Sequence, residues 1–347
     1  MALREAEGSP GVPWERPLRG TLEKLTVESE LLAGNPLGDS AKRPLWIYSA
    51  PGVGEDPVPS VYVIQGYTGQ VDAWANRSPF EPNLLERLDA MFASGDCPPA
   101  VVVLVDAWTA YGGSQFINSS STGPYMDYLC DEVVPFVDAR HPTLPGPEHR
   151  GLTGKSSGGF GAMVVPMLRP DVFGGLASHS GDALFEAAYL AMFPEAARKL
   201  RDEFEGSWDV LWERLRSADH FDYDTFGGLD LYGYAAAYSP DPQRPGKALM
   251  PFEASTGRLI EEVWAQWLDW DPVRMAPRHA DALRGMRRIH IEAGKADEYF
   301  LDLGAQAFSD ELAKLGVEHT LELFDGKHGG LTYRYPAAIR ELVLALR

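Results

Sequence analysis

Apolar residues follow one another without polar interruption in two segments of the first third of the chain. These are Ser60 to Gln65 and Ala100 to Asp106. Uninterrupted apolar runs of this length are typical of strands that are covered on both faces of a sheet. Leu84 to Phe92, between them, has the spacing of a helix, and Thr21 to Leu31 and Pro44 to Ser49 are expected to form strands before them.

The second half of the chain continues the alternation of strands and helices. A helical pattern covers Tyr125 to Ala139, and the apolar run Val172 to Ser178 is expected to be a strand. Near the C-terminus we expect a strand from Arg288 towards Asp297, a helix from Phe300 to Leu315 and a strand from Val317 to Phe324. Strands that alternate with helices predict an α/β fold around a mostly parallel, doubly wound sheet.

The pentapeptide Gly154-Lys155-Ser156-Ser157-Gly158 matches the Gly-x-Ser-x-Gly pattern. In that pattern the serine stands on a sharp turn between a strand and a helix, where its hydroxyl is exposed to a base. The flanking glycines suit such a turn because they have no Cβ atom to obstruct it. A structural glycine turn is the alternative, but the expected order of strand, turn, helix and strand favours Ser156 as a nucleophile.

A serine nucleophile needs a base and an acid, which in this type of site follow the serine in the order acid, then histidine. His328 lies in a glycine-flanked loop after the expected strand that ends at Phe324, and we predict that it is the base. A histidine that only caps a turn is the alternative. Asp297, after the preceding strand, is the predicted acid, with Glu298 and Asp302 as the other possibilities.

An oxyanion hole requires two backbone N–H groups directed at the reacting carbonyl oxygen. The residue after the nucleophile, Ser157, is expected to supply one of them. The second should come from an early loop after a strand, and the amide of Tyr67 in Gly66-Tyr67-Thr68-Gly69 is the best candidate. The alternative for this loop is an ordinary glycine turn.

About 95 residues separate the expected strand near Ser178 from the strand that carries the acid, and they include sixteen aromatic residues. We predict that residues 182–276 form a helical cap above Ser156, since ligands of open α/β sheets bind beyond the carboxyl ends of the strands. Most of these aromatics should build the core of the cap, and a few should line the pocket. Gly66, His179 and Asp182 are candidate substrate contacts, although a structural role in a turn is equally open for His179.

Several segments resemble the esterase D-type branch of the α/β-hydrolases, which includes S-formylglutathione hydrolases, enterochelin esterases, feruloyl esterases and secreted mycolyltransferases. The resemblance covers about three quarters of the chain and is clearest in Ser156-Ser-Gly-Gly-Phe-Gly-Ala162 and Gly112-Gly-Ser-Gln-Phe116. It implies an α/β-hydrolase fold with antiparallel opening strands, and the same triad and oxyanion residues as above. The expected division is a surface segment (1–19), a catalytic domain (20–181 and 277–347) and the cap (182–276).

Composition and charge narrow the expected partners. A net charge of −19 would repel phosphates, so neither nucleic acid nor an anionic membrane is an expected partner. No apolar run is long enough to span a bilayer, and the N-terminus has no apolar signal region, so a cytoplasmic location is expected. The two cysteines, Cys97 and Cys130, predict neither a disulfide framework nor a metal site, and no cofactor is expected.

These features together predict a serine hydrolase that cleaves a small-molecule carboxylic ester through an acyl-enzyme. Acyl transfer to an alcohol and cleavage of an amide or peptide are the alternatives within the same chemistry. A binding protein without catalytic activity is a further alternative, which the complete set of Ser156, Asp297 and His328 disfavours.

Overall fold

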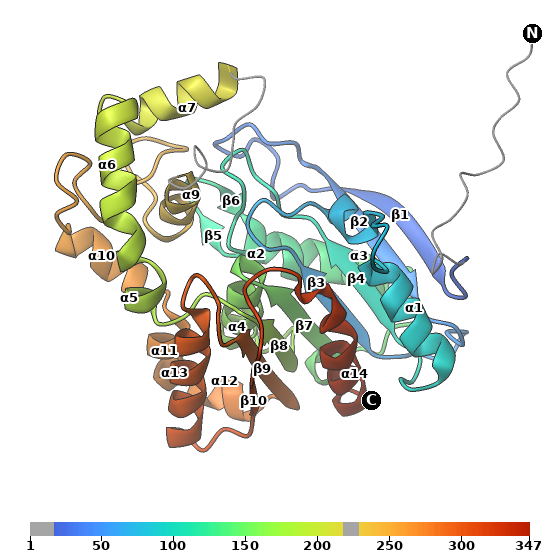
Figure 1. Cartoon of the computed structure of the whole chain (residues 1–347). Coiled ribbons are helices and arrows are strands. Elements are labelled where there is room, and N and C mark those ends of the chain that lie inside the picture. The colour runs from blue at the N-terminus through green and yellow to red at the C-terminus, as the bar shows by residue number, and fades with distance from the viewer. Residues whose placement is uncertain (1–16, 218–228) are drawn as a thin grey trace, which may run out of the picture.

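The computed structural model describes residues 17–217 and 229–347. Its centre is an eight-stranded sheet in the order β1-β2-β4-β3-β7-β8-β9-β10 (Figure 1). The two pairings β1 with β2 and β2 with β4 are antiparallel, and all the others are parallel. The strands are β1 (Thr21–Glu28), β2 (Lys42–Ser49), β3 (Ser60–Ile64), β4 (Val101–Val105), β7 (Arg150–Lys155), β8 (Gly175–His179), β9 (Arg288–Gly294) and β10 (Thr320–Phe324).

The central strands are apolar throughout because each of their two faces has its own core. In β3, Val61 and Val63 belong to one cluster of buried residues, while Tyr62 and Ile64 belong to the cluster on the opposite face. All four side chains are fully buried. Successive side chains of a strand point to opposite faces, so a strand covered on both sides has no place for polar residues.

Helices cover both faces of the sheet (Figure 1). The helices α1 (Leu84–Ser94) and α14 (Tyr335–Ala345) share one apolar cluster with the sheet. On the other face lie α4 (Ser157–Leu168) and the segment α2 (Tyr125–Asp127), η2 (Tyr128–Val133) and α3 (Val134–Asp138). The predicted continuous helix Tyr125 to Ala139 therefore forms, but with a π-helical turn in its middle.

The remaining elements connect or flank these layers. A two-stranded sheet pairs β5 (Asn118–Ser119) with β6 (Gly123–Pro124), and α13 (Leu301–Lys314) packs on β9 and β10. The short helices outside the cap are η1 (Val71–Ala75), η3 (Pro147–His149), η5 (Ala276–His279), α12 (Ala280–Arg284) and η6 (Leu331–Tyr333).

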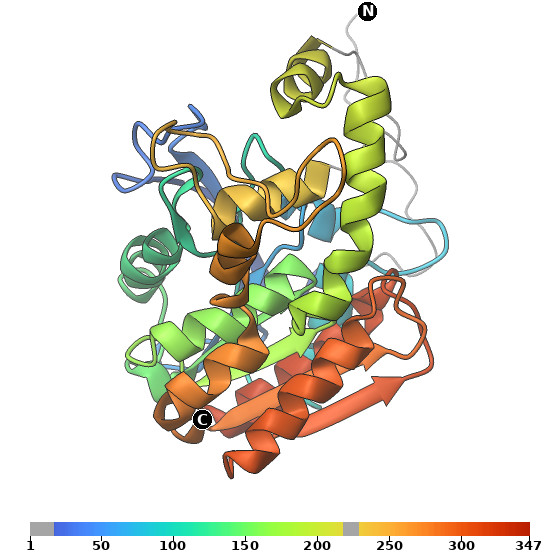
Figure 2. The ribbon, with the colours of Figure 1, turned by 90° about the vertical axis from the view of Figure 1, so that its left-hand side faces the viewer.

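Residues 182–276, named the cap segment from here on, are mainly helical and lie beyond one edge of the sheet (Figures 1 and 2). The described helices are α5 (Phe185–Ala188), η4 (Leu190–Met192), α6 (Phe193–Glu203), α7 (Trp208–Ser217), α9 (Leu229–Tyr238), α10 (Glu261–Leu268) and α11 (Pro272–Met275). This confirms the predicted aromatic-rich helical region. The division of the chain into catalytic and cap segments at those boundaries stays a prediction.

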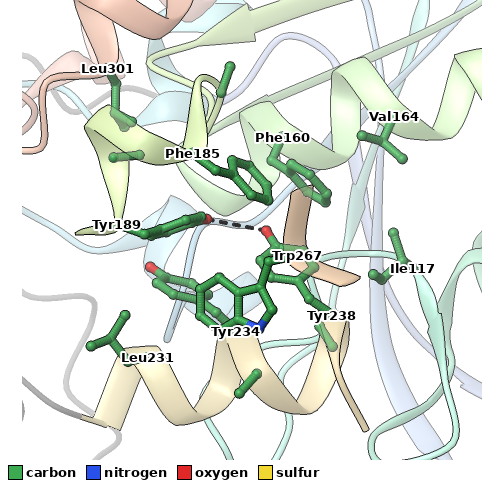
Figure 3. Packing of buried hydrophobic residues seen from close by; sticks show 14 of the residues in the cluster. Ile117, Phe160, Val164, Phe185, Tyr189, Leu231, Tyr234, Tyr238, Trp267 and Leu301 are labelled. Carbon is green, nitrogen blue, oxygen red and sulfur yellow. Dashed lines mark hydrogen bonds between the residues drawn. The ribbon is translucent and has the colours of Figure 1, made fainter. Parts of the chain in front are cut away.

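The aromatic residues of the cap segment build a core that continues into the sheet domain. Trp267 and Phe252 are buried, and the ring of Tyr238 packs edge-on against Phe160 of α4 with 5.4 Å between the ring centroids. Figure 3 shows this cluster at the junction of α4 and the cap helices. Three of the sixteen aromatic residues counted in the cap segment, Phe221, Tyr223 and Phe226, lie outside the described residues.

Candidate active site

Ser156 stands at the sharp turn between β7 and α4, with φ 58° and ψ −126°. A positive φ is strained for a residue with a side chain and typically costs about 1–3 kcal/mol. The neighbouring glycines are needed because a side chain at either position would collide with the backbone. A Cβ atom at Gly154 would lie 2.5 Å from the carbonyl oxygen of Gly158, and one at Gly158 would lie 2.6 Å from that of Ile64.

Backbone hydrogen bonds hold this turn in place. The amide of Ser156 donates to the carbonyl of His179 on β8 (3.0 Å), and its own carbonyl accepts from the amide of Phe160 (2.8 Å). The strained residue is therefore fixed to the neighbouring strand and to the first turn of α4. Its hydroxyl is left above the end of the sheet.

His328 connects this hydroxyl to a buried carboxylate. Its Nε2 atom lies 3.1 Å from Ser156 Oγ, and its Nδ1 atom lies 2.9 Å from Asp297 Oδ2. Since a carboxylate only accepts, Nδ1 carries the proton, and Nε2 can accept the proton of the serine. The parallel strands β9 and β10 are neighbours, which brings the loops that follow them, with Asp297 and His328, to the same edge of the sheet.

The other two candidate acids have different positions. Glu298 accepts the backbone N–H of His328 (3.1 Å) and pairs with Lys327 (3.1 Å), so it holds the histidine loop from outside. Asp302, on α13, makes no hydrogen bond to His328 in the structure. The second oxygen of Asp297 accepts from the amide of Tyr299 (3.0 Å), which fixes the orientation of the carboxylate.

The two backbone amides proposed for the oxyanion hole come from segments next to Ser156. Ser157 is the first residue of α4, and the first amides of a helix have no acceptor within the helix. A Cβ atom on Gly66 would lie 3.5 Å from Ser156 Cβ, so the Gly66–Tyr67 loop approaches the nucleophile closely. The Tyr67 hydroxyl donates to the carbonyl of Tyr111 (2.5 Å).

A cavity of about 510 Å³ opens above Ser156 and His328. Two of the three candidate substrate contacts, Gly66 and Asp182, line it. On the cap side the lining residues are Ala188, Tyr189, Ala191, Met192, Glu195, Asp230 and Tyr234, and on the opposite side they are Glu298, Tyr299, Phe300 and Leu301. Of the aromatics of the cap segment, Tyr189 and Tyr234 thus reach the cavity.

His179, the third candidate contact, does not lie in the cavity. Its side chain is fully buried, its Nδ1 atom lies 2.7 Å from Glu292 Oε1, and its ring stacks on Tyr335 with 4.2 Å between centroids. Of the two roles left open for His179, contact with substrate is therefore ruled out by burial, and a structural role beneath the catalytic edge remains. Side chains alternate between faces along a strand, and the position of His179 at the end of β8 directs its ring towards α14.

The cavity has several carboxylates in a partly dehydrated setting. Burial raises the pKa of Asp182 to about 6, although Tyr189 and Gln115 donate hydrogen bonds to its Oδ2 atom (3.0 and 3.2 Å). Burial also raises the pKa of Asp230, to about 7. Lys155 also lines the cavity, and burial lowers its pKa against the opposing effect of nearby carboxylates.

Several residues of this cavity were not identified as site residues from the sequence. Lys155 could have been, since it immediately precedes the nucleophile in the motif. Glu195, Asp230 and Tyr234 had no such signal, because only the folding of the cap segment brings them to the cavity.

Two further observations concern metals and membranes. Within residues 17–217 and 229–347, no group of three or more His, Cys, Asp or Glu side chains is arranged to hold a metal ion. In the same described part of the chain, no helix has both the length and the apolar character required to cross a bilayer.

The sheet topology and the position of the strained serine turn define an α/β-hydrolase fold. A family model described as "Putative esterase" matches residues 53–335, and the chain belongs to this family. The resemblance deduced from the sequence motifs is thereby confirmed.

Individual relatives are more distant. The iron(III) enterobactin esterase of Dickeya dadantii (strain 3937) is 27% identical over 142 residues, which are 40% of this chain and only 30% of that protein. Among solved structures, an S-formylglutathione hydrolase from Agrobacterium tumefaciens has a TM-score of 0.59 at 14% identity, with 96% of this chain and 98% of that chain covered. A ferulic acid esterase has a TM-score of 0.58 at 16% identity, with 95% and 99% covered.

Proposed function

We propose that the protein is a serine hydrolase that cleaves a carboxylic ester through an acyl-enzyme. The observation that carries this proposal is the continuous hydrogen-bonded series from Ser156 Oγ through the two ring nitrogens of His328 to Asp297. Membership of the esterase family supports the reaction type. The proposed oxyanion donors, the amides of Tyr67 and Ser157, complete the requirements of acyl transfer.

The proposed reaction has two halves. His328 Nε2 takes the proton of Ser156 as the oxygen attacks the ester carbonyl, and the two amides bind the oxygen that becomes negative. His328 then gives this proton to the departing alcohol, and an acyl group remains on Ser156. In the second half His328 removes a proton from water, which attacks the acyl group and releases the acid and the free serine.

Asp297 acts by orientation and charge rather than by accepting a proton. Its carboxylate holds the Nδ1–H tautomer of His328 and stabilises the imidazolium that forms when the serine is deprotonated. The amide of Tyr299 and the burial of the Asp297 side chain hold the carboxylate in one orientation. No cofactor has a role in these steps.

Labelling with a fluorophosphonate probe tests the proposal directly. The intact protein should gain one probe mass, located on the peptide that contains Ser156, and Ser156→Ala should gain none. A library of p-nitrophenyl and aryl esters of graded acyl length then identifies the preferred acyl group. Absence of labelling in the folded protein would favour a binding protein without catalytic activity.

Product analysis separates hydrolysis from its close alternatives. With a competing alcohol present, a hydrolase releases mainly the free acid, whereas an acyltransferase forms a new ester. Matched aryl amides test amide cleavage. Predominant formation of the new ester or faster turnover of amides would replace the ester-hydrolase proposal while leaving the triad in place.

A further inference from the structure

The cap-side wall of the cavity combines negative charge with aromatic rings. Asp182, Glu195 and Asp230 lie on it together with Tyr189 and Tyr234. The ring centroid of Tyr234 is 5.2 Å from that of Tyr189 and 5.2 Å from that of Tyr67, which also lines the cavity. The rings contact one another, and an aromatic ring that lines a cavity can attract a cation.

Two polar side chains of this wall are more than nine-tenths buried and yet lack full hydrogen bonding within the described residues. Tyr234 is 8% exposed, and its hydroxyl has no hydrogen-bond partner there. Asp230 is also 8% exposed, and it accepts only at Oδ1, from the amide of Leu231 (2.8 Å). Neither the Tyr234 hydroxyl nor an Asp230 oxygen is among the buried polar atoms that lack a partner, so the unbonded atoms are accessible from the cavity and can bind a ligand there.

Lys155, the one lysine among the described residues that line the cavity, does not make the cavity positively charged. Lys155 is surrounded by the charges of Asp297, Asp182 and Glu298, all of which act to keep it protonated. Burial lowers the pKa of Lys155 against the effect of these carboxylates, so the ammonium group of Lys155 faces more negative than positive side chains in the cavity. Asp230 and Glu195 face the cavity without a basic side chain bonded to them among the described residues.

We propose that the cavity binds a substrate with a positively charged ammonium group, which lies beside the Asp230 carboxylate and against the cavity-facing side of the Tyr234 ring. This inference rests on the proposed ester hydrolysis and specifies its substrate class. A carboxylate in the first turn of α9 is favourable on its own, which accounts for Asp230 in part. It does not account for Asp182 and Glu195 on the same wall.

The test compares choline with its neutral carbon analogue, in which a tert-butyl group replaces the trimethylammonium group. The two have the same shape and differ in charge. Choline should slow fluorophosphonate labelling of Ser156 at an about tenfold lower concentration than the analogue, the ratio that corresponds to about 1.4 kcal/mol. The acetate esters of the two alcohols should differ by a similar factor in kcat/KM, and the preference should weaken at high salt.

Charge-neutral variants assign the effect to the wall. Asp230→Asn should reduce the preference for choline over its carbon analogue to about twofold or less. Tyr234→Phe keeps the aromatic ring and removes only the contribution of the hydroxyl group to this preference. Asp202→Asn is the matched control: it removes the same charge from an exposed residue of α6 that pairs with Arg201. This control should keep the full preference.

The outcomes separate the inference from the proposed function. Equal protection of Ser156 from labelling by choline and its carbon analogue would overturn the cationic-substrate inference. Better protection by an anionic analogue, in which a carboxylate replaces the hydroxymethyl group of the carbon analogue, would also overturn it. In both cases the labelling of Ser156 itself would still support the hydrolase. If the wild-type protein is not labelled, titration calorimetry with choline and its analogue decides the inference on its own. Binding of choline that Asp230→Asn abolishes would support it, and equal or absent binding would overturn it.

Discussion

The ring of Tyr67 lies against Gly233 of the cap helix α9 so closely that a Cβ atom on this glycine would be 2.7 Å from the ring. The same Cβ atom would also be 2.7 Å from the carbonyl oxygen of Tyr111. Tyr67 belongs to the loop proposed for the oxyanion hole, so the backbone of the cap segment determines where this loop can lie.

Gly233→Ala should therefore impair catalysis even though alanine favours a helix by about 1 kcal/mol over glycine. The methyl group displaces the Tyr67 ring, and a small displacement of an oxyanion donor is expected to lower kcat/KM about 10- to 100-fold. Steady-state kinetics on an activated ester measures this. Gly54→Ala is the control, since a Cβ atom there meets nothing within 4 Å. Unchanged kinetics in Gly233→Ala would contradict the proposed role of the Tyr67 loop.

Variants of the triad should behave as one unit. Ser156→Ala and His328→Ala should each remove nearly all activity, and the double variant should be little worse than either, because neither residue works without the other. Asp297→Asn should cost about four orders of magnitude in kcat, since an amide favours the wrong tautomer of His328. Asp302→Asn is the matched control and should keep near wild-type rates. Additive losses, or a larger effect at Asp302 than at Asp297, would disprove the assignment.

The fold and the nucleophile could be predicted because they depend on local patterns. The runs at Val61 to Ile64 and Val101 to Val105 are apolar because both faces of the sheet are covered. An uninterrupted apolar run can be recognised directly in the sequence. The glycines around Ser156 reflect contacts within a few residues and with one neighbouring strand. Chain order then restricts the base and acid to a small number of residues.

The cap-side wall of the cavity could not be predicted, because only tertiary packing brings its residues together. Asp230 and Glu195 look like ordinary helix surface residues in the sequence. For His179 the polarity of the side chain and its position at a strand end left a pocket role and a structural role equally open. The alternation of faces in β8 and its contacts with Glu292 and Tyr335 instead direct it into the interior.

Glu292 should contribute strongly to stability through its buried network. Burial alone would raise the pKa of this carboxyl, but hydrogen bonds from His179, His290 and Arg334 outweigh it and hold the pKa well below its usual range. Glu292→Gln should lower the free energy of unfolding by about 3–5 kcal/mol at pH 7, as expected when one partner of a buried charge network is removed. Urea denaturation measures this change.

The pH dependence of that loss has a defined sign. A carboxyl with a depressed pKa in the folded state stabilises the protein above its unfolded pKa, about 4.3, and this contribution declines as the pH falls below that value. The difference between wild type and Glu292→Gln should thus be constant from pH 7 to about 5 and shrink on further acidification. Glu55→Gln, at an exposed turn, should show no such difference. A difference that grows with acid would refute the proposed network contribution.

Asp230 should have the opposite effect on stability, because burial raises its pKa to about 7. The folded state then binds the proton more tightly than the unfolded state, so the carboxyl destabilises the protein increasingly as the pH rises from about 4 to 7. Asp230→Asn should be more stable than wild type at pH 8, by an amount on the order of 2–4 kcal/mol, and equal to it near pH 4. Asp202→Asn should show no comparable gain.

The same titration predicts how substrate choice depends on pH. Ionisation of Asp230, and of Asp182 with its pKa of about 6, makes the wall more negative between pH 5 and 8. The ratio of kcat/KM for the choline ester to that for its carbon analogue should rise over this range. The ratio removes every effect of pH that is common to the two substrates. Among the described residues, the other ionisable groups that line the cavity are Lys155, Glu195, Glu298, His328, Tyr67, Tyr189, Tyr234 and Tyr299. Asp230→Asn should flatten most of the rise, and a wild-type ratio that is independent of pH would show that these carboxylates do not select the substrate.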